Sequence, residues 1–229
     1  MQPLRIGPLG DAALYAEFSL SLDLRVNEAL QAVAAALRER APPWVRDVVP
    51  SFGGLALHFD LDHAELPEVP LQAATGLLKD CLKAAARPRK SGRQVEVPVC
   101  YDPEFGLDLE EVAAKTGLDH AAIVRRHAAT EHRVLMVGFA PGQPYIGGLD
   151  RRLAVPRRAT PRTRVPAGSI AIANAQTVVY PFEIAGGWSV LGRTPLRVFD
   201  PQRKPPSLLL PGDRVRFAPI SRAAYERLK

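Results

Sequence analysis

The stretch SIAIANAQTVVYPFEI, residues 169–184, decides the fold class of the C-terminal half of this chain. Its two runs of apolar and β-branched residues, 169–173 and 177–184, are typical of short β strands. Many short strands with Gly and Pro turns between them predict a β barrel or a β sandwich. Further runs of this kind occupy residues 94–100, 132–139, 188–192, 196–199 and 213–220.

A pair of short helices is predicted near the start of this β region. Asp108 and Glu111 have the spacing of a capping box, and Asp119 precedes the helical run HAAIVRRHAA, residues 120–129. The whole stretch 109–130 also resembles a helix-turn-helix. Because its second helix offers few polar side chains for base edges, we expect the pair to pack against the β region and no binding to nucleic acid.

The N-terminal part of the chain alternates between strand and helix patterns. Residues 12–18 read as a strand, 25–39 as a helix, 46–60 as two strands and 71–85 as a second amphipathic helix. This β-α-β-β-α order predicts a two-layer α+β domain with its helices on one face of the sheet.

A basic stretch, RPRKSGR at residues 87–93, has few groups to bury and marks a domain boundary. The fold class predicted for the chain is therefore an α+β domain over residues 1–88, followed by a mainly β domain over residues 94–229.

Composition excludes several kinds of protein. At 229 residues the chain is long enough to bury a core without disulfides. Neither Cys81 nor Cys100 has metal-binding spacing, and the five histidines form no HExxH pattern, so no metal site is predicted in this chain. Because signal-peptide features and membrane-length apolar runs are lacking, we expect a cytoplasmic protein that does not bind membranes.

The formal net charge is +6, and arginines gather in residues 151–164. Their planar guanidinium groups suit carboxylate or phosphate, so the segment is either a solvated basic loop or an anion-binding segment. Pro156 and Pro161 within the segment, and Pro166 just after it, stiffen the chain. This favours anion binding, with Arg157 and Arg162 as better candidates than Arg151 and Arg152. Neither standard phosphate-binding loop, GxxxxGK[ST] or GxGxxG after a strand, occurs anywhere in the sequence.

Gly and Pro residues surround Tyr145 in VGFAPGQPYIGGLD, residues 137–150. Such a loop either reverses the chain or forms a wall where backbone approaches a ligand closely. Trp188 and Tyr180 supply apolar walls with polar edges, or belong to the core. His127 is either a core histidine or a site residue.

Several ordered blocks of sequence resemble one family, that of the 5-oxoprolinase B subunits, also called allophanate hydrolase subunit 1 or Kip-type kinase inhibitor proteins. The resemblance is close over residues 95–219 and looser in the N-terminal part. It implies a ferredoxin-like N-terminal domain and a cyclophilin-like β-barrel domain. The blocks are GFAPGQPYIGGLD (138–150), LAVPRRATPRTRVPAGSIAIANAQTVVYP (153–181), GGWSVLGRTPLRVFDP (186–201) and PPSLLLPGDRVRF (205–217).

The resemblance also implies a function. The chain is expected to be one component of an ATP-dependent 5-oxoprolinase, which opens 5-oxo-L-proline to L-glutamate together with the A and C subunits and with ATP and Mg in the assembled complex. Two alternatives stay open: a component of a biotin-dependent urea or amide carboxylase or allophanate hydrolase system, and an inhibitor that binds a histidine kinase. The sequence departs from the family pattern at Gln143, where relatives usually carry an aromatic residue, and at Asn174, Ala175, Val178 and Val179, where they carry a glycine-rich stretch.

On this basis we expect one of three arginines, Arg157, Arg162 or Arg193, to hold a substrate carboxylate or a phosphoryl oxygen. His127 is the candidate proton carrier, and Tyr145, Gln176 and Thr177 are expected to orient the ring. The candidate catalytic residues are His127 and Arg193, and the candidate substrate-binding residues are Phe139, Pro141, Gly142, Tyr145, Gly148, Arg157, Arg162, Ser169, Gln176, Thr177, Tyr180 and Trp188.

Overall fold

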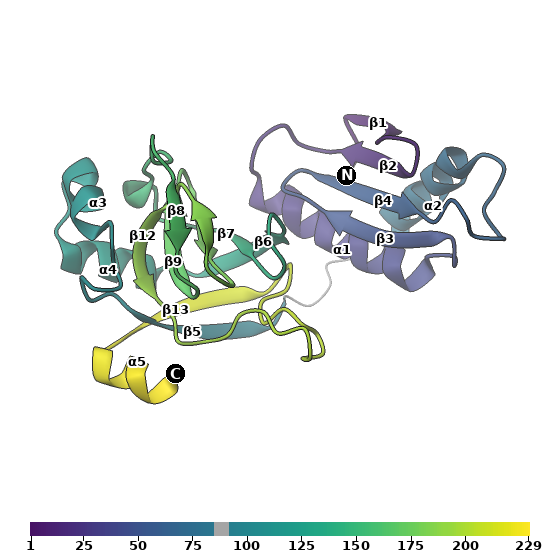
Figure 1. Ribbon diagram of the computed structural model, residues 1–229. Helices are drawn as coiled ribbons and strands as arrows, with labels where there is room; N and C mark the ends of the chain where they lie inside the picture. Colours follow the sequence, from purple (N-terminus) through teal and green to yellow (C-terminus); the bar gives the residue numbers. More distant parts are fainter. Residues whose placement is uncertain (85–91) are drawn as a thin grey trace. The chain divides into compact units, whose positions relative to one another are not determined.

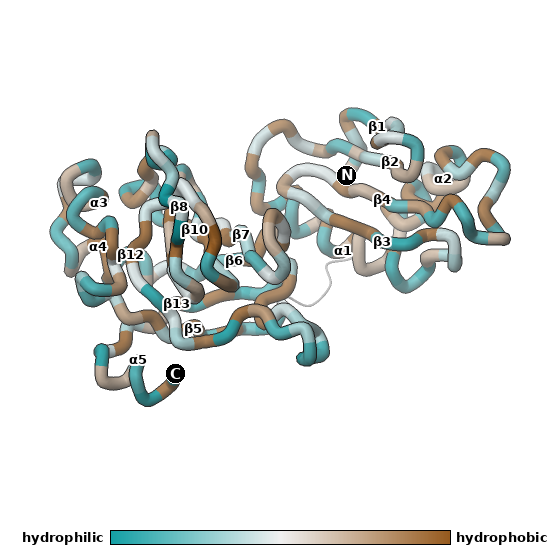
Figure 2. The backbone as a smooth tube through the Cα atoms, viewed as in Figure 1, coloured by the Kyte–Doolittle hydropathy of each residue, from teal (hydrophilic) through white to brown (hydrophobic). Residues whose placement is uncertain are grey.

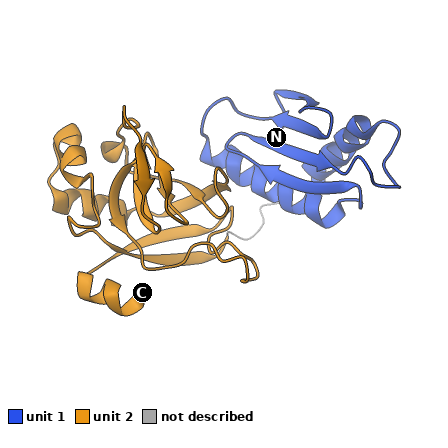
Figure 3. Ribbon diagram, viewed as in Figure 1, with its two compact units in different colours: residues 1–90 blue, residues 91–229 orange. Residues whose placement is uncertain are grey.

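The structure of the chain is a computed structural model that describes residues 1–84 and 92–229. The chain divides into two compact units, Met1–Lys90 and Ser91–Lys229 (Figure 3). Most of the predicted linker, residues 87–91, lies outside the described residues.

The first unit is a four-stranded antiparallel sheet in the order β1-β2-β4-β3, with two helices packed on it (Figure 1). The sequence prediction missed β1, whose residues RIGP carry little apolar surface and which forms by backbone pairing with β2. The ferredoxin-like description of this unit stays a prediction. The elements are β1 (Arg5–Pro8), β2 (Ala13–Glu17), α1 (Leu24–Arg40), β3 (Val45–Pro50), β4 (Gly54–Phe59) and α2 (Pro70–Ala84).

Helix α1 shows why these residues form a helix here. The Asp23 carboxylate caps its first turn by accepting hydrogen bonds from the amides of Arg25 and Val26, at 2.8 and 3.2 Å. The helix ends just before Pro42 and Pro43. Its apolar residues recur at helical spacing and are fully buried against the sheet: Leu30, Val33, Ala34 and Leu37.

The second unit is built on a closed β barrel in the strand order β10-β7-β6-β13-β5-β12-β9. The barrel, rather than a sandwich, is therefore the fold of this region. Its first and last strands, β5 and β13, pair in parallel from Gln94↔Arg214 to Cys100↔Ile220. The cyclophilin-like description stays a prediction. The strands are β5 (Gln94–Cys100), β6 (His132–Val137), β7 (Pro144–Gly147), β9 (Ser169–Ala173), β10 (Gln176–Val179), β12 (Ser189–Arg193) and β13 (Arg214–Ile220).

Two strand predictions in this unit were wrong in detail. The run 177–184 divides near Pro181 into β10 and the short strand β11 (Ile184–Gly186), because proline has no amide hydrogen for a ladder. The run 196–199 contributes only an isolated bridge between Phe199 and Ser207. Strand β11 pairs instead with β8 (Arg162–Val165) in a separate two-stranded sheet.

Helices α3 (Leu109–Thr116) and α4 (His120–Ala129) pack against the barrel, next to β12 and β13, as Figure 1 shows. Asp119 caps α4 as predicted and accepts a hydrogen bond from the Ala122 amide at 2.6 Å. Val112 and Ile123 carry the apolar faces of the pair into the barrel core. The second unit also contains a short 3-10 helix, Arg151–Leu153, and a C-terminal helix, α5 (Arg222–Leu228).

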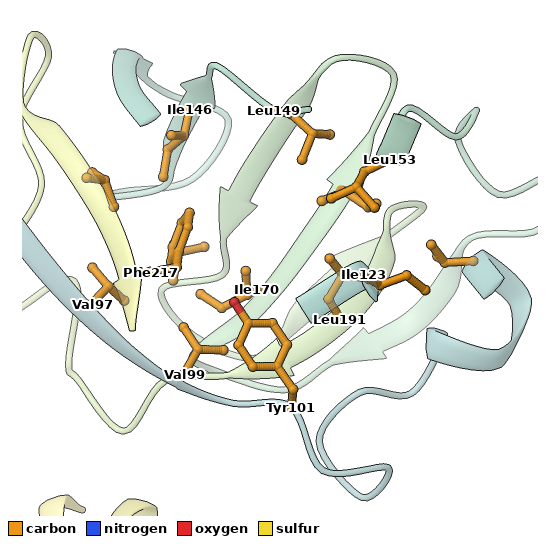
Figure 4. Close-up of a cluster of buried hydrophobic side chains, with 14 of the residues drawn as sticks. Val97, Val99, Tyr101, Ile123, Ile146, Leu149, Leu153, Ile170, Leu191 and Phe217 are labelled. Atoms are coloured by element: carbon orange, nitrogen blue, oxygen red, sulfur yellow. The ribbon is translucent and has the colours of Figure 1, made fainter. Parts of the chain in front are cut away.

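The barrel strands contribute to two separate apolar clusters, and alternate residues of β9 enter one or the other. The larger cluster draws on all seven strands and therefore fills the interior; Figure 4 shows Val99, Ile170, Leu191 and Phe217 within it. Hydrophobic residues also gather along the strands in Figure 2. The smaller cluster, called here the outer cluster, covers the outside of β9, β10 and β12 and consists of Val165, Ala171, Ala173, Val178, Tyr180, Trp188 and Val190.

Candidate functional site

Three of the predicted site residues meet on the outer cluster. The rings of Tyr145 and Trp188 lie edge to face, with centroids 5.9 Å apart and an interplanar angle of 70°. The guanidinium carbon of Arg157 lies 5.5 Å from the Trp188 ring centroid, in cation–π geometry. Arg157 is exposed while Trp188 is buried, so the arginine presents a cation to solvent over an apolar base.

Tyr145 connects this arrangement to Gln143, a polar residue that was not among the predicted site residues. Burial raises the pKa of Tyr145, and the charge of Arg157 and a hydrogen bond from the Gln143 side chain oppose that rise. Gln143 is buried, and its Oε1 has no hydrogen-bond partner among the described residues. The signal that marks Gln143 in the sequence is its departure from the family pattern.

Tyr180 lies beneath the same face and is fully buried. Burial raises its pKa to about 12, although the charges of Arg157 and Arg162 oppose the rise. Its hydroxyl accepts a hydrogen bond from the Trp188 backbone and occupies the place that a side chain at Gly186 would need. Tyr180 is therefore a neutral, fixed support for Trp188.

The arginine segment is attached to the barrel by Asp108. Arg162, predicted to hold a ligand anion, donates to both carboxylate oxygens of Asp108 at 2.7 Å each. Arg158 also donates to Asp108, at 2.6 Å, and contacts Glu111. Asp108 makes no capping hydrogen bond to α3, so the predicted capping box is wrong; its carboxylate accepts from the Val190 amide at 2.7 Å instead.

These contacts explain how Arg157 is positioned. The backbone amide of Arg158 donates a hydrogen bond to the Gly187 carbonyl at 2.8 Å. Both the side chain and the backbone of Arg158 are therefore held in place, and this fixes the chain next to Arg157. Neighbouring side chains in an extended segment point in opposite directions. Arg158 therefore turns toward Asp108 while Arg157 turns toward Trp188.

His127 and Thr177 lie in the barrel interior instead. The His127 ring is fully buried and stacks on Phe217, with centroids 4.5 Å apart. Its Nδ1 lies 2.7 Å from the Tyr101 hydroxyl and its Nε2 lies 3.3 Å from Thr177 Oγ1. Burial, followed by the neighbouring His132, lowers the pKa of His127 well below its ordinary value. This is the placement of the core histidine that the sequence left as an alternative to a proton carrier.

Arg193 and Ser169 are brought together on neighbouring strands. They are direct partners across β12 and β9, and Arg193 Cζ lies 5.6 Å from the Phe105 ring centroid. Ser169 is buried, and both Ser169 Oγ and Arg193 Nε are buried atoms without a hydrogen-bond partner among the described residues.

The remaining predicted residues lie at turns. Phe139 and Gly142 belong to the β6–β7 turn, where Phe139 is 72% exposed with φ 70° and Gly142 has φ 76° beside Phe199. Pro141 is exposed in the same turn, and Gly148, φ 92°, approaches the Glu131 carbonyl after β7. Gln176 begins β10 opposite Ala173, so it lies at the edge of the outer cluster.

Within residues 1–84 and 92–229, no group of three or more His, Cys, Asp or Glu side chains is arranged to hold a metal ion. The described helices include none that is both long and apolar enough to cross a membrane.

By its fold, the second unit belongs among proteins with a closed seven-stranded β barrel. The chain belongs to the family described as carboxyltransferase domain, subdomain C and D, whose model matches residues 4–209. The predicted resemblance to the B subunits of 5-oxoprolinase is also confirmed. The 5-oxoprolinase B subunit from Bacillus subtilis is 39% identical over 231 residues, which cover 98% of this chain and 96% of the relative.

Solved structures agree with the fold. The crystal structure of TTHA0988 is similar with a TM-score of 0.78 at 38% identity; the match covers 91% of this chain but only 40% of that longer chain. The urea carboxylase of Kluyveromyces lactis has a TM-score of 0.77 at 17% identity, over 97% of this chain and 22% of the enzyme. At that identity, the likeness concerns the fold alone.

Proposed function

We propose that this chain is the B subunit of an ATP-dependent 5-oxoprolinase, which acts in the cytoplasm with homologues of the A and C subunits to open 5-oxo-L-proline to L-glutamate. The observation that carries the proposal is the match to the B subunit of Bacillus subtilis, at 39% identity over nearly the whole of both chains. ATP with Mg is required in the assembled complex.

The outer cluster supports this proposal as a place for a small cyclic amide. Trp188 and Tyr145 offer ring faces and edges, and Arg157 offers a cation to the substrate carboxylate. The Gln143 amide oxygen, buried without a partner among the described residues, suits the ring N–H of a lactam. A ligand that supplies this donor removes the cost of an unsatisfied acceptor.

The chemistry explains why the chain needs partners. A lactam carbonyl is a poor electrophile, and phosphorylation of its oxygen by ATP, with release of ADP, would activate the carbonyl carbon. Water would add to that carbon, the ring C–N bond would break with a proton passing to nitrogen, and hydrolysis of the resulting acyl phosphate would release inorganic phosphate. The sequence contains neither standard phosphate-binding loop, so the proposal assigns part of the nucleotide site to a partner chain of the complex. The residues of this chain are assigned to orienting the ring and holding its carboxylate.

The test is co-expression of the chain with homologues of the A and C subunits, followed by measurement of L-glutamate release from 5-oxo-L-proline and ATP. We expect glutamate release only from the complete complex. The same complex is also assayed with urea and carboxylated biotin, the substrates expected for the alternative carboxylase function. Turnover of that pair, without glutamate release, would contradict the proposal.

A further inference from the structure

Arg193 differs from three other part-buried arginines of the barrel unit, whose charges are neutralised by aspartates. Arg158 and Arg162 pair with Asp108, and Arg126 pairs with Asp150 at 2.9 Å. The Arg193 guanidinium is also part-buried, yet within the described part of the chain it makes no ion pair and no hydrogen bond. Among the described residues, the guanidinium contacts the ring face of Phe105 in cation–π geometry.

This isolation is costly in physical terms. A partly desolvated guanidinium without a counter-ion loses hydration that nothing replaces, and a buried N–H without an acceptor loses a hydrogen bond. Arg193 Nε is such a group. An aromatic face compensates part of the charge but cannot accept the Nε hydrogen bond in the plane of the guanidinium.

Ser169 provides a second unsatisfied group beside the first. It pairs with Arg193 across β9 and β12, and side chains directly opposite each other project from the same face of a sheet with Cβ atoms about 5 Å apart. Ser169 is 1% exposed, and its Oγ has no partner among the described residues. A hydroxyl and a guanidinium at this separation are able to donate to one shared acceptor.

Neighbouring backbone leaves room for this arrangement. A side chain at Gly168 would clash with the Thr194 carbonyl oxygen and would lie 3.3 Å from Arg193 Cγ, so glycine lets this backbone and the arginine stem lie close to the start of β9. On the other side of Ser169, the Tyr180 amide donates to the Ser169 carbonyl at 3.0 Å. The row Tyr180–Ser169–Arg193 therefore joins this pair to the tyrosine beneath Trp188.

We propose that Arg193 and Ser169 form a binding subsite for one oxyanion of a small substrate, either its phosphoryl group or, in place of Arg157, its carboxylate. The two groups donate to the same anionic oxygen, which supplies the charge and the acceptor that the protein lacks there. The choice of substrate for the test rests on the proposed function. The subsite itself rests on the two unpartnered atoms and their pairing across the strands.

The test uses the whole purified chain and three probes: inorganic phosphate, 5-oxo-L-proline, and 2-pyrrolidinone, which is the same ring without the carboxylate. Binding is followed by calorimetry and by the NMR signal of the Arg193 Nε–H. We expect phosphate or 5-oxo-L-proline to shift that signal and 2-pyrrolidinone to leave it unchanged. A response to phosphate alone assigns the subsite to a phosphoryl group, and a response to 5-oxo-L-proline alone assigns it to the carboxylate.

Variants separate binding from a structural role. Arg193→Gln is expected to weaken binding of the active probe about tenfold or more, because it removes the positive charge that pairs with the anion. Ser169→Ala is expected to weaken binding by a smaller factor, because it removes one hydrogen bond and no charge. Arg216→Gln is the matched control, since Arg216 is an exposed arginine on β13, and it leaves binding unchanged. Arg193→Met should leave the Tm of the unliganded chain unchanged or higher, because it removes an uncompensated charge.

Two results would overturn the subsite: no shift of the Arg193 signal with either anion, or equal binding by the parent chain and Arg193→Gln. A large fall in Tm for Arg193→Met would assign the arginine a structural role instead. In the assembled complex, Arg193→Ala is expected to lower kcat/KM at least tenfold. If the complex releases no glutamate while Arg193-dependent anion binding persists, the proposed function fails and the subsite stands.

Discussion

Both terminal nitrogens of Arg162 lie 2.7 Å from the carboxylate of Asp108, one on each oxygen. The carboxylate is 2% exposed and also receives hydrogen bonds from Arg158 and from the Val190 amide. A single aspartate at the start of α3 thus joins the arginine segment to a barrel strand 82 residues further along the chain. This contact sets the position of Arg157 over Trp188.

Replacing Asp108 by Ala should destabilise the barrel unit strongly. Two part-buried guanidinium groups and one buried amide would lose their acceptor, which costs about 3–5 kcal/mol when a buried pair is broken. Urea unfolding followed by circular dichroism measures the loss. Glu183→Gln is the control, because its contact with Arg164 spans 3.7 Å between exposed side chains and should change stability by less than about 1 kcal/mol. Equal stabilities for the two variants would show that the Asp108 network does not hold the fold.

Replacing Arg157 by Gln should affect turnover and leave stability almost unchanged. Its side chain is exposed, so the loss of its contact with Trp188 should lower the free energy of unfolding by no more than about 1 kcal/mol. If it holds the substrate carboxylate, kcat/KM for 5-oxo-L-proline in the assembled complex should fall about tenfold or more. Arg151→Gln, another exposed arginine of the same segment, serves as the control. Identical kinetics for both variants would remove Arg157 from the site.

The stability of the barrel unit should decrease in mild acid because of its two buried histidines. Burial lowers the pKa of both His127 and His132 below the ordinary value of 6.5. The unfolded chain therefore binds more protons than the folded chain below pH 6.5, and the free energy of unfolding falls as pH drops through that value. Each histidine contributes at most about 1.4 kcal/mol per pH unit until the pH reaches its folded-state pKa.

Urea unfolding at a series of pH values between about 8 and 5.5, a range that spans the ordinary pKa of histidine, tests this dependence of stability on pH. His127→Gln should reduce the slope of the unfolding free energy against pH by the equivalent of roughly one proton. It should also lower stability at neutral pH, because it disturbs the contact with Tyr101. A parent chain with the same unfolding free energy at both ends of the series would contradict the expected coupling.

Gly142→Ala should destabilise the β6–β7 turn for two separable reasons. The residue has φ 76°, and an added Cβ would lie 2.6 Å from Phe199 Cβ. Together, backbone strain and overpacking should cost about 2–4 kcal/mol. Gly117→Ala isolates the strain, because Gly117 has φ 68° with nothing within 4 Å of an added Cβ. If the two variants lose equal stability in thermal unfolding, the contact with Phe199 carries no cost.

Local patterns were sufficient to predict most of the elements. The run 169–173 is a strand as predicted, and the helix carrying Leu30 and Leu37 ends where Pro42 requires. Strand β1 escaped prediction because its stability comes from pairing with β2 and not from its own residues. The choice of a barrel over a sandwich also lay outside local patterns, because it depends on the parallel pairing of β5 with β13, more than a hundred residues apart.

The sequence by itself determined most of the strands and helices, the family and the residue types of the candidate site. Only the tertiary structure decided which of those residues meet. Arg162 and Arg193 are the same residue type, and the sequence does not distinguish their surroundings. The fold brings the Asp108 carboxylate to Arg162, whereas strand register places Arg193 opposite Ser169, without a partner for its Nε among the described residues. Local propensity acts over a few residues, whereas the charge balance of a side chain depends on groups that the fold brings from distant positions.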